Sequence, residues 1–279
     1  LKSGAKNAGS GEESGAVALK KLLAADPSNA EALAAIDGYH TKARELGKAG
    51  DFAGAAKFLG LALVATEPAP GVKVAIEKGD SALAAGDLAG AESAFSDATD
   101  LEANNATGKA GYDIAKAARL AGLKAAVAEA KSGTNSDSAS AALAKSLEVD
   151  PNSAEAREAF KELVATAKAR GAEGKDREAA KLLDAANTVS KPEQAKKAIA
   201  AANAMLGDGK HDEAVEAYAK FNANAESAVS RAGQEIAHAR RVQVLMAGVA
   251  ELKNGGDLDR GAKATKAMLV LDTTNADAL

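Results

Sequence analysis

Three histidines are the side chains of this sequence with the most versatile chemistry, because imidazole binds metal ions and exchanges protons near neutral pH. His40, His211 and His238 lie far apart along the chain, and none stands at the short spacing of a metal-binding pair. We therefore expect structural or solvent-facing roles for all three. The sequence contains no cysteine, which excludes disulfide bonds, thiolate metal sites and thiol nucleophiles.

Two short segments carry part of a ligand-binding motif. Residues 207–210 have the sequence GDGK, which lacks the full spacing of a phosphate-binding loop and the strand that precedes one. Residues 254–261, NGGDLDRG, hold carboxylates two positions apart as calcium loops do, but no Glu follows at the twelfth position. We interpret both as turns between helices, the second with an N-cap. No nucleophile elbow surrounds a Ser or Thr, and we predict a protein that is not an enzyme and takes no cofactor or metal.

The charge balance limits the partners. The 279 residues include 35 Lys and Arg and 39 Asp and Glu, mixed along the chain, for a formal net charge of −4. This is not the basic footprint of a protein that binds nucleic acid or anionic lipid, and we expect neither partner. No run of about 18 apolar residues is present, so we expect a soluble protein without a membrane span. The sequence leaves the compartment open; the start at Leu1 makes a processed, secreted or cell-surface protein one option.

One modification motif is present. Asn105, Ala106 and Thr107 form an N-glycosylation sequon, which we place in a loop between two helices. Such a triplet arises readily by chance, so Asn105 is a weak candidate site.

Helical periodicity runs through nearly every segment. Apolar residues recur three and four positions apart, as in Ala18, Leu19, Leu22 and Leu23. Ala, Leu, Lys and Glu dominate, and alternating runs rich in Val, Ile and Thr are missing. Glycines and prolines interrupt the pattern at short intervals, which predicts helices of roughly 12 to 30 residues. The predicted fold class is all-α.

The sequence repeats itself over a long distance. The peptide DPSNAEAL at 26–33 recurs as DPNSAEAR at 150–157 and as DTTNADAL at 272–279, at separations of 124 and 122 residues. Gly47 and Gly50 correspond to Gly171 and Gly174, and AGYDIAKAAR at 110–119 corresponds to AGQEIAHARR at 232–241. We predict two copies of one module, module 1 at 26–149 and module 2 at 150–271. Residues 1–25 would be a partial N-terminal repeat unit, and 272–279 the start of a further unit.

Each module divides into three helical hairpins. A glycine, a small residue five positions on and a larger apolar residue four further on mark a second helix. The clear instances are Gly50, Ala55, Leu59; Gly86, Ala91, Phe95; Gly174, Ala179, Leu183; and Gly209, Ala214, Tyr218. The glycine supplies the tight turn, and the small residue lets the helix backbones approach. The third hairpin is longer, so we expect long helices over roughly 106–131 and 225–254 that project from the array.

These second helices resemble those of the tetratricopeptide repeat (TPR) family, a helix-turn-helix unit with small and large residues at fixed positions. The matching residues are Ala55, Leu59, Ala62, Ala91, Phe95 and Ala98. The family's Trp is absent, but the resemblance covers nearly the whole chain. It implies a right-handed superhelical α-solenoid of stacked TPR-like hairpins.

The resemblance also implies a concave groove lined by the first helices of the hairpins. The groove residues would be His40, Arg44, Lys73, Asp80, Lys161, Lys168, Lys196 and Asn203. They are polar and mixed in sign. Only Lys196 and Asn203 approach the clamp with which some members of the family hold a terminal carboxylate, so we expect no such clamp.

Two classes of function stay open. The first is a non-enzymatic scaffold that binds a peptide or partner protein along the groove. The second is a structural protein whose copies join end to end into a filament or surface array. Neither end has the polar cap of a solenoid, which is expected either if the sequence is a window from a longer array or if copies stack head to tail. The second option rests on the stacking explanation, on the similarity of the two modules and on the weak groove chemistry.

Overall fold

The computed structural model describes residues 13–188, 190, 193–223 and 227–271. These residues form thirteen α-helices and no strand, which confirms the all-α prediction. The helices are α2 (Glu13–Ala25), α3 (Ala30–Lys48), α4 (Phe52–Thr66), α5 (Pro70–Ala84), α6 (Leu88–Leu101), α7 (Ala106–Lys131), α8 (Ser136–Val149), α9 (Ala154–Ala172), α10 (Asp176–Asn187), α11 (Glu193–Gly207), α12 (His211–Asn222), α13 (Ala228–Lys253) and α14 (Leu258–Leu271). Residues 1–12 of the predicted partial repeat and the predicted further unit at 272–279 lie outside the described residues.

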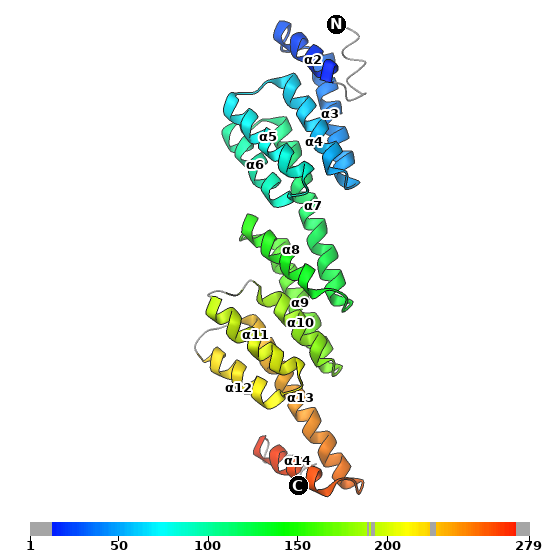
Figure 1. Ribbon diagram of the computed structural model, residues 1–279, viewed down its shortest axis with the longest axis vertical. Helices are drawn as coiled ribbons and strands as arrows, with labels where there is room; N and C mark the ends of the chain where they lie inside the picture. Colours follow the sequence, from blue (N-terminus) through cyan, green and yellow to red (C-terminus); the bar gives the residue numbers. More distant parts are fainter. Residues whose placement is uncertain (1–12, 189, 191–192, 224–226, 272–279) are drawn as a thin grey trace. The chain divides into compact units, whose positions relative to one another are not determined.

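Six connections between successive helices are tight turns built on a glycine. The φ angles of these glycines lie between 74° and 84°, a conformation that L side chains rarely adopt. The six residues are Gly50, Gly86, Gly133, Gly174, Gly209 and Gly255. They join α3 to α4, α5 to α6 and α7 to α8, and then α9 to α10, α11 to α12 and α13 to α14 (Figure 1). The turns at Gly50, Gly86, Gly174 and Gly209 are those that the glycine pattern predicts, and Gly133 and Gly255 supply the same turn in the third hairpin of each module.

Both partial ligand motifs of the sequence lie in these turns. The GDGK segment ends α11 and begins α12, with Lys210 as the N-cap. In the other segment, Asp257 Oδ1 accepts hydrogen bonds from the backbone N–H groups of Asp259 and Arg260, each at 3.0 Å. These bonds satisfy N–H groups that a helix start leaves unpaired. The interpretation of both motifs as inter-helix turns is confirmed.

The first helices of the three hairpins have matching lengths in the two modules, whereas the second helices α4 and α6, with 15 and 14 residues, are longer than α10 and α12, with 12 each. α3 and α9 have 19 residues each, α5 and α11 have 15 each, and α7 and α13 have 26 each. The two 26-residue helices confirm the long helices predicted near 106–131 and 225–254.

The expectation that the first long helix projects is wrong. Leu123, Val127 and Ala130 of α7 are buried in one core cluster with Leu163 of α9 and Leu182 of α10. The additional turns of α7 carry an apolar stripe, and burial of that stripe stabilises the fold more than exposure to water would.

The chain divides into two compact units, and the division falls inside α7. Unit 1 comprises the residues up to Gly122 with Glu148–Pro151, and unit 2 comprises Leu123–Leu147 with the residues from Asn152 onward. Unit 1 has two core clusters, one around Leu19 and Tyr39 and one around Phe95, whereas the core of unit 2 is a single cluster. Within unit 1, α3 pairs with α4 and α5 with α6; within unit 2, α9 pairs with α10 and α11 with α12 (Figure 1).

In both units the first helix of the module packs directly on the long helix. A Cβ atom on Gly47 of α3 would lie 2.5 Å from Cγ2 of Ile114 on α7, and Gly171 of α9 meets Ile236 of α13 in the same way. A side chain at either glycine would overlap its neighbour, so glycine sets the distance between the two helices. First helices of the first and third hairpins therefore touch, at a place where the TPR resemblance implies an open groove.

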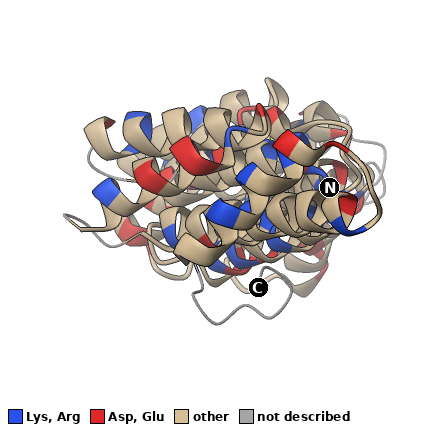
Figure 2. Cartoon of the chain, turned by 90° about the horizontal axis from the view of Figure 1, so that it is seen from below, with Lys and Arg blue, Asp and Glu red and all other residues tan. Residues whose placement is uncertain are grey.

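The described surface carries both signs of charge. Lys and Arg are interspersed with Asp and Glu on the helices seen in Figure 2. Among the described residues, none of the helices combines the length and the apolar character needed to cross a bilayer.

Candidate functional site

The eight predicted groove residues all lie on first helices of hairpins. They are His40 and Arg44 on α3, Lys73 and Asp80 on α5, Lys161 and Lys168 on α9, and Lys196 and Asn203 on α11. The two modules thus contribute four residues each, and the structure gives these residues three different environments.

The first environment is exposed and ion-paired. Arg44 and Lys168 stand at equivalent positions, and each reaches a carboxylate on the long helix of its module. Arg44 Nη2 lies 4.0 Å from Asp113 Oδ2, and Lys168 Nζ lies 2.6 Å from Glu235 Oε2. Asp113 and Glu235 are themselves equivalent, so the same cross-helix ion pair recurs with different residue types.

The other three lysines of the predicted groove do not reach the long helix. Lys73 pairs with Glu77 at 3.7 Å and Lys161 with Glu158 at 3.6 Å, each on its own helix. Such exposed pairs contribute about 0–1 kcal/mol. Lys196 is half-buried, and its backbone carbonyl accepts a hydrogen bond from Asn187. These residues leave their charges at the surface, where a partner can reach them.

The second environment is the packed interior between α3 and α7. His40 is only 3% exposed, and its Nε2 lies 3.0 Å from Thr107 Oγ1. Burial lowers the pKa of His40, Arg44 adds to this effect, and Asp37 opposes it. The His40 ring is thus part of the packing between the two helices, where Thr107 is its buried partner, and it does not line a solvent-facing groove. Of the other histidines, His211 is half-buried beside Asp176 and His238 is exposed.

The third environment surrounds Asp80 and Asn203, which occupy equivalent positions in the two modules. Asn203 is fully buried; its Nδ2 donates to Asp184 Oδ1 at 2.7 Å, and its Oδ1 accepts from the Tyr218 hydroxyl. The positions of Asp184 and Tyr218 in module 2 are those of Gly60 and Phe95 in module 1, neither of which can bond to Asp80. Asp80 Oδ1 is buried without a hydrogen-bond partner among the described residues. Burial, and secondarily Glu77, raises the pKa of Asp80 to about 8.

The sequon residue Asn105 is an N-cap. Its Oδ1 accepts a hydrogen bond from the backbone N–H of Gly108 at 2.8 Å, and the residue is 8% exposed. Ser227, at the equivalent position of module 2, caps α13 in the same way. The Nδ2 atom, to which a glycan would attach, lies 3.5 Å from Glu102 Oε2, so the whole amide group packs at the start of α7.

A surface hollow of about 580 Å³ lies in unit 1 at the C-terminal end of α3, beside α7. We name it the α3–α7 hollow. It is lined by Arg44, Gly47, Lys48, Gly50, Phe52, Asp113, Ile114, Ala117, Ala118 and Ala121. Only Arg44 belongs to the predicted groove. The other residues were missed because most are small or apolar and suggest helix packing rather than a site.

Module 2 shows which side chain occupies the equivalent space. Ala118 corresponds to Arg240, and Phe52 corresponds to Asp176. Arg240 extends over Gly174, where an added Cβ would lie 3.4 Å from its guanidinium carbon, whereas a Cβ on the equivalent Gly50 would meet nothing within 4 Å. The hollow therefore exists in module 1 because alanine stands where module 2 has arginine.

Arg240 is fixed in place by a polar network. Its Nε donates to Asp176 Oδ1 at 2.7 Å, and His211 Nε2 lies 2.8 Å from Asp176 Oδ2. The residue of module 1 at the position of His211 is Leu88. An acid, an imidazole and a guanidinium in module 2 are thus replaced by Phe52, Leu88 and Ala118.

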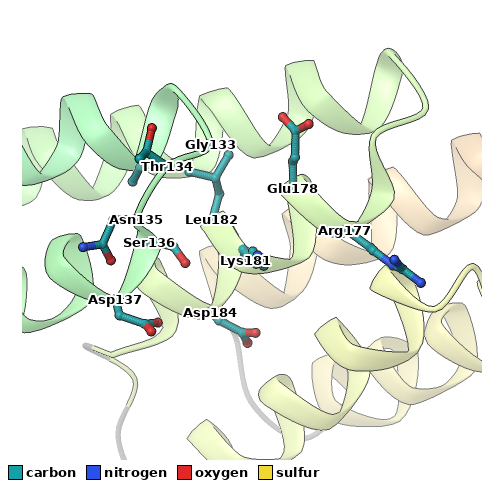
Figure 3. Close-up of a pocket in the computed structure, with 11 residues that line it drawn as sticks. Gly133, Thr134, Asn135, Ser136, Asp137, Arg177, Glu178, Lys181, Leu182 and Asp184 are labelled. Carbon is teal, nitrogen blue, oxygen red and sulfur yellow. The ribbon is translucent and has the colours of Figure 1, made fainter.

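A second hollow, of about 250 Å³, lies in unit 2 between the turn at 133–137 and α10 (Figure 3). Asp137 and Asp184 stand together on one side of it, and Glu178 stands on the other (Figure 3). The pKa of Asp184 is raised, mainly because burial removes hydration and also because Asp137 is nearby, although the hydrogen bond from Asn203 opposes the shift. Glu178 already pairs with Arg170 at 3.2 Å. Positively and negatively charged side chains both line this hollow, so it favours neither an anionic nor a cationic ligand.

Neither a search for metal-binding clusters nor a comparison with known proteins assigns a function to the chain. In the part of the chain that the structure describes, no three His, Asp or Glu side chains gather closely enough to hold a metal ion. No family model matches the chain, and no curated protein matches it either.

Proposed function

We propose that the chain is a TPR-like interaction scaffold, a right-handed solenoid of stacked hairpins that binds a peptide or partner protein and is not an enzyme. The observation that carries this proposal is the pair of modules. The lengths of the first helices, the glycine turns and the close helix contacts recur between them, while the side chains on the first helices and around the α3–α7 hollow differ. A repeated frame with varied surface residues is typical of solenoid binding proteins.

Selection of binding peptides tests the scaffold. The purified chain is presented with a phage-displayed library of random peptides, and enriched peptides are titrated against the chain and against the variant Lys161→Glu with Lys168→Glu. Both lysines are exposed on α9, so reversal of their charge alters the first-helix surface without touching the core. We expect enriched peptides whose affinity falls at least about tenfold in this variant.

The matched control is Lys57→Glu with Lys181→Glu. These two residues are exposed at equivalent positions of the second helices α4 and α10, and the change in net charge is the same. The control is expected to bind like the original chain, and far-ultraviolet circular dichroism checks that all variants stay helical. Absence of enriched peptides, or equal loss in both variants, would contradict the proposal.

End-to-end assembly of copies is the second candidate. The observation that favours it is a set of exposed apolar side chains on α13 and α14: Val244, Met246, Leu258 and Val270, between 43% and 77% exposed. The equivalent residues of module 1 are Gly122, Lys124, Ser136 and Glu148. Exposed apolar side chains of this size favour association, and contacts between unlike surfaces extend into filaments.

Module 1 supplies the variant that tests assembly. Met246→Lys, Leu258→Ser and Val270→Glu place the module 1 residues on α13 and α14. Light scattering and electron microscopy over a concentration series are expected to show assemblies of the original chain and dispersed particles of the variant. Dispersed particles from both chains would eliminate this candidate.

A further inference from the structure

We infer that the α3–α7 hollow is a docking site for an acidic peptide segment in which two neighbouring apolar side chains adjoin a carboxylate. This inference rests on the proposed scaffold function and specifies the partner chemistry at one site. The hollow is distinct from the groove of first helices, since it lies beside the turn that joins α3 to α4.

The repeat itself shows that this space accepts a polypeptide side chain. In unit 2 the side chain of Arg240 crosses the equivalent position over Gly174. In unit 1 the chain provides only the methyl group of Ala118 there, and the space stays open to an external group. A volume of about 580 Å³ exceeds that of one side chain and falls in the range of ligand pockets, so we assign two apolar side chains to it.

The floor of the hollow selects apolar groups. Asp176, which accepts the guanidinium N–H of Arg240 in unit 2, is replaced by Phe52. An incoming cation would find no acceptor at the position of Asp176, and the carboxylate that does line the hollow, Asp113, already lies 4.0 Å from Arg44. The cation would lose hydration, which is unfavourable for a charge without a partner. Phe52 is half-buried and Ile114 is 6% exposed, so both present apolar surface that an aliphatic or aromatic side chain can cover.

The rim of the hollow selects an anion. Arg44 and Lys48 contribute two positive charges, and Asp113 contributes one negative charge. Asp113 is engaged with Arg44 at 4.0 Å, which leaves Lys48 as the excess cation. The equivalent residue in module 2 is Ala172, so the excess is a property of module 1. A carboxylate beside the apolar side chains would complete the charge balance.

Blocked heptapeptides provide the probes. One set has Leu-Phe-Glu or Phe-Phe-Glu at its centre, and twin peptides carry Lys or Gln in place of Glu. Calorimetric titration of the full chain is expected to show the Glu peptides binding at least about tenfold more tightly than the Lys peptides. Lys48→Ala is expected to remove most of the preference for Glu over Gln. The control Lys57→Ala, an exposed lysine on α4, is expected to preserve it.

Filling the hollow tests the location. Ala118→Arg with Phe52→Asp copies the pair that unit 2 already contains, and it is expected to weaken binding of the Glu peptides at least about tenfold. The reverse change in unit 2, Arg240→Ala with Asp176→Phe and His211→Leu, opens the equivalent space. Adding Ala172→Lys to it is expected to raise the stoichiometry from one peptide per chain to two. Circular dichroism and thermal unfolding check the fold of each variant.

Three outcomes would overturn the inference: Glu peptides that do not bind, Glu peptides that bind no better than the Lys twins, or unchanged affinity in the filled variant. If library peptides still bind the chain in any of these cases, the hollow is wrong and the scaffold proposal stands. If library peptides fail as well, both proposals fail.

Discussion

Modules 1 and 2 share a frame and much of its apolar core, but not the polar groups inside it. The glycine turns, the 26-residue helices and the glycine contacts between first and long helices recur at equivalent positions. The polar groups inside that frame differ almost everywhere they can be compared. Backbone approach is therefore fixed by small residues, while polar contacts change between modules.

Some polar residues that bond to each other in one module are both replaced in the other. His40 and Thr107, which bond to each other in module 1, correspond to Val164 and Val229 in module 2. A buried polar group costs free energy unless a partner accompanies it, so a change in one member of a pair demands a change in the other. Asp80 departs from this pattern, because its module 1 neighbours Gly60 and Phe95 supply no partner. Arg119 departs from it as well: module 2 keeps the arginine as Arg241 although Glu92 is replaced by Val215, and Arg241 pairs with Asp212 instead.

The largest expected effect is the loss of a buried ion pair that only module 1 has. Arg119 donates to both oxygens of Glu92, at 2.7 and 3.1 Å, and the two side chains are 6% and 3% exposed. Glu92→Ala leaves the guanidinium buried without its acid, which we expect to cost about 3–5 kcal/mol of unfolding free energy. Urea unfolding followed by circular dichroism measures the change.

The equivalent arginine of module 2 is the comparison. Arg241 pairs with Asp212, whose side chain is 66% exposed, so Asp212→Ala is expected to cost about 1 kcal/mol or less. The double change Glu92→Val with Arg119→Leu, which uses the Val of module 2 at position 215, is expected to regain most of the loss. Similar costs for Glu92→Ala and Asp212→Ala would show that the modules do not differ here.

A change to the shared frame should have the next largest effect. Gly47→Ala places a Cβ against Ile114 and forces α3 away from α7, at an expected cost of about 1–3 kcal/mol. Gly38→Ala on the same helix is the control: an added Cβ there meets nothing within 4 Å, and helix propensity predicts a gain of about 0.5–1 kcal/mol. Opposite signs in thermal unfolding would tie the effect to the contact, and equal signs would refute it.

Asp80 makes the stability of module 1 depend on pH. Its pKa is about 8 in the folded chain and 3.8 as a free group, so the folded state binds a proton that the unfolded state releases. Stability contributed by this group is present below pH 4 and is lost as the pH rises from 4 to 8. Asp80→Asn places at position 80 the amide side chain that module 2 has as Asn203. It is expected to raise the free energy of unfolding by about 2 kcal/mol at pH 8.5 and to change it little at pH 4. Urea unfolding at both pH values measures the difference, and an equal effect at both would contradict it.

Much of the frame was predictable from the sequence, whereas the site was not. Glycine spacing and helical periodicity are local, so the turns and the long helices followed from them. The contact of α3 with α7 joins His40 to Thr107 across 67 residues, and no local pattern encodes it. His40 was therefore placed in a groove although it is buried.

The α3–α7 hollow left a trace in the sequence nonetheless. Alignment of the modules sets Ala118 against Arg240 and Phe52 against Asp176, two changes of size and charge within an otherwise similar pattern. Such a trace becomes a site only when the fold shows that both positions face one space. Differences between aligned modules were thus a better guide to the hollow than the polar residues of the predicted groove.

The smallest expected effect concerns helix starts that only module 1 caps. Asp51 and Asp87 accept hydrogen bonds from the N–H groups of Gly54 and Gly90, at 2.8 and 3.2 Å, whereas the equivalent N-caps of module 2 are Lys175 and Lys210, without a side-chain bond. Lys210→Asn adds an acceptor without a new negative charge beside Asp212 and is expected to stabilise the chain by about 0.5–1 kcal/mol. Asp87→Ala is expected to cost about 1 kcal/mol, because it removes the bond that module 2 never had. Both values come from urea unfolding, and if Lys210→Asn brings no gain, the turn before α12 holds its backbone in a geometry that an added acceptor cannot reach.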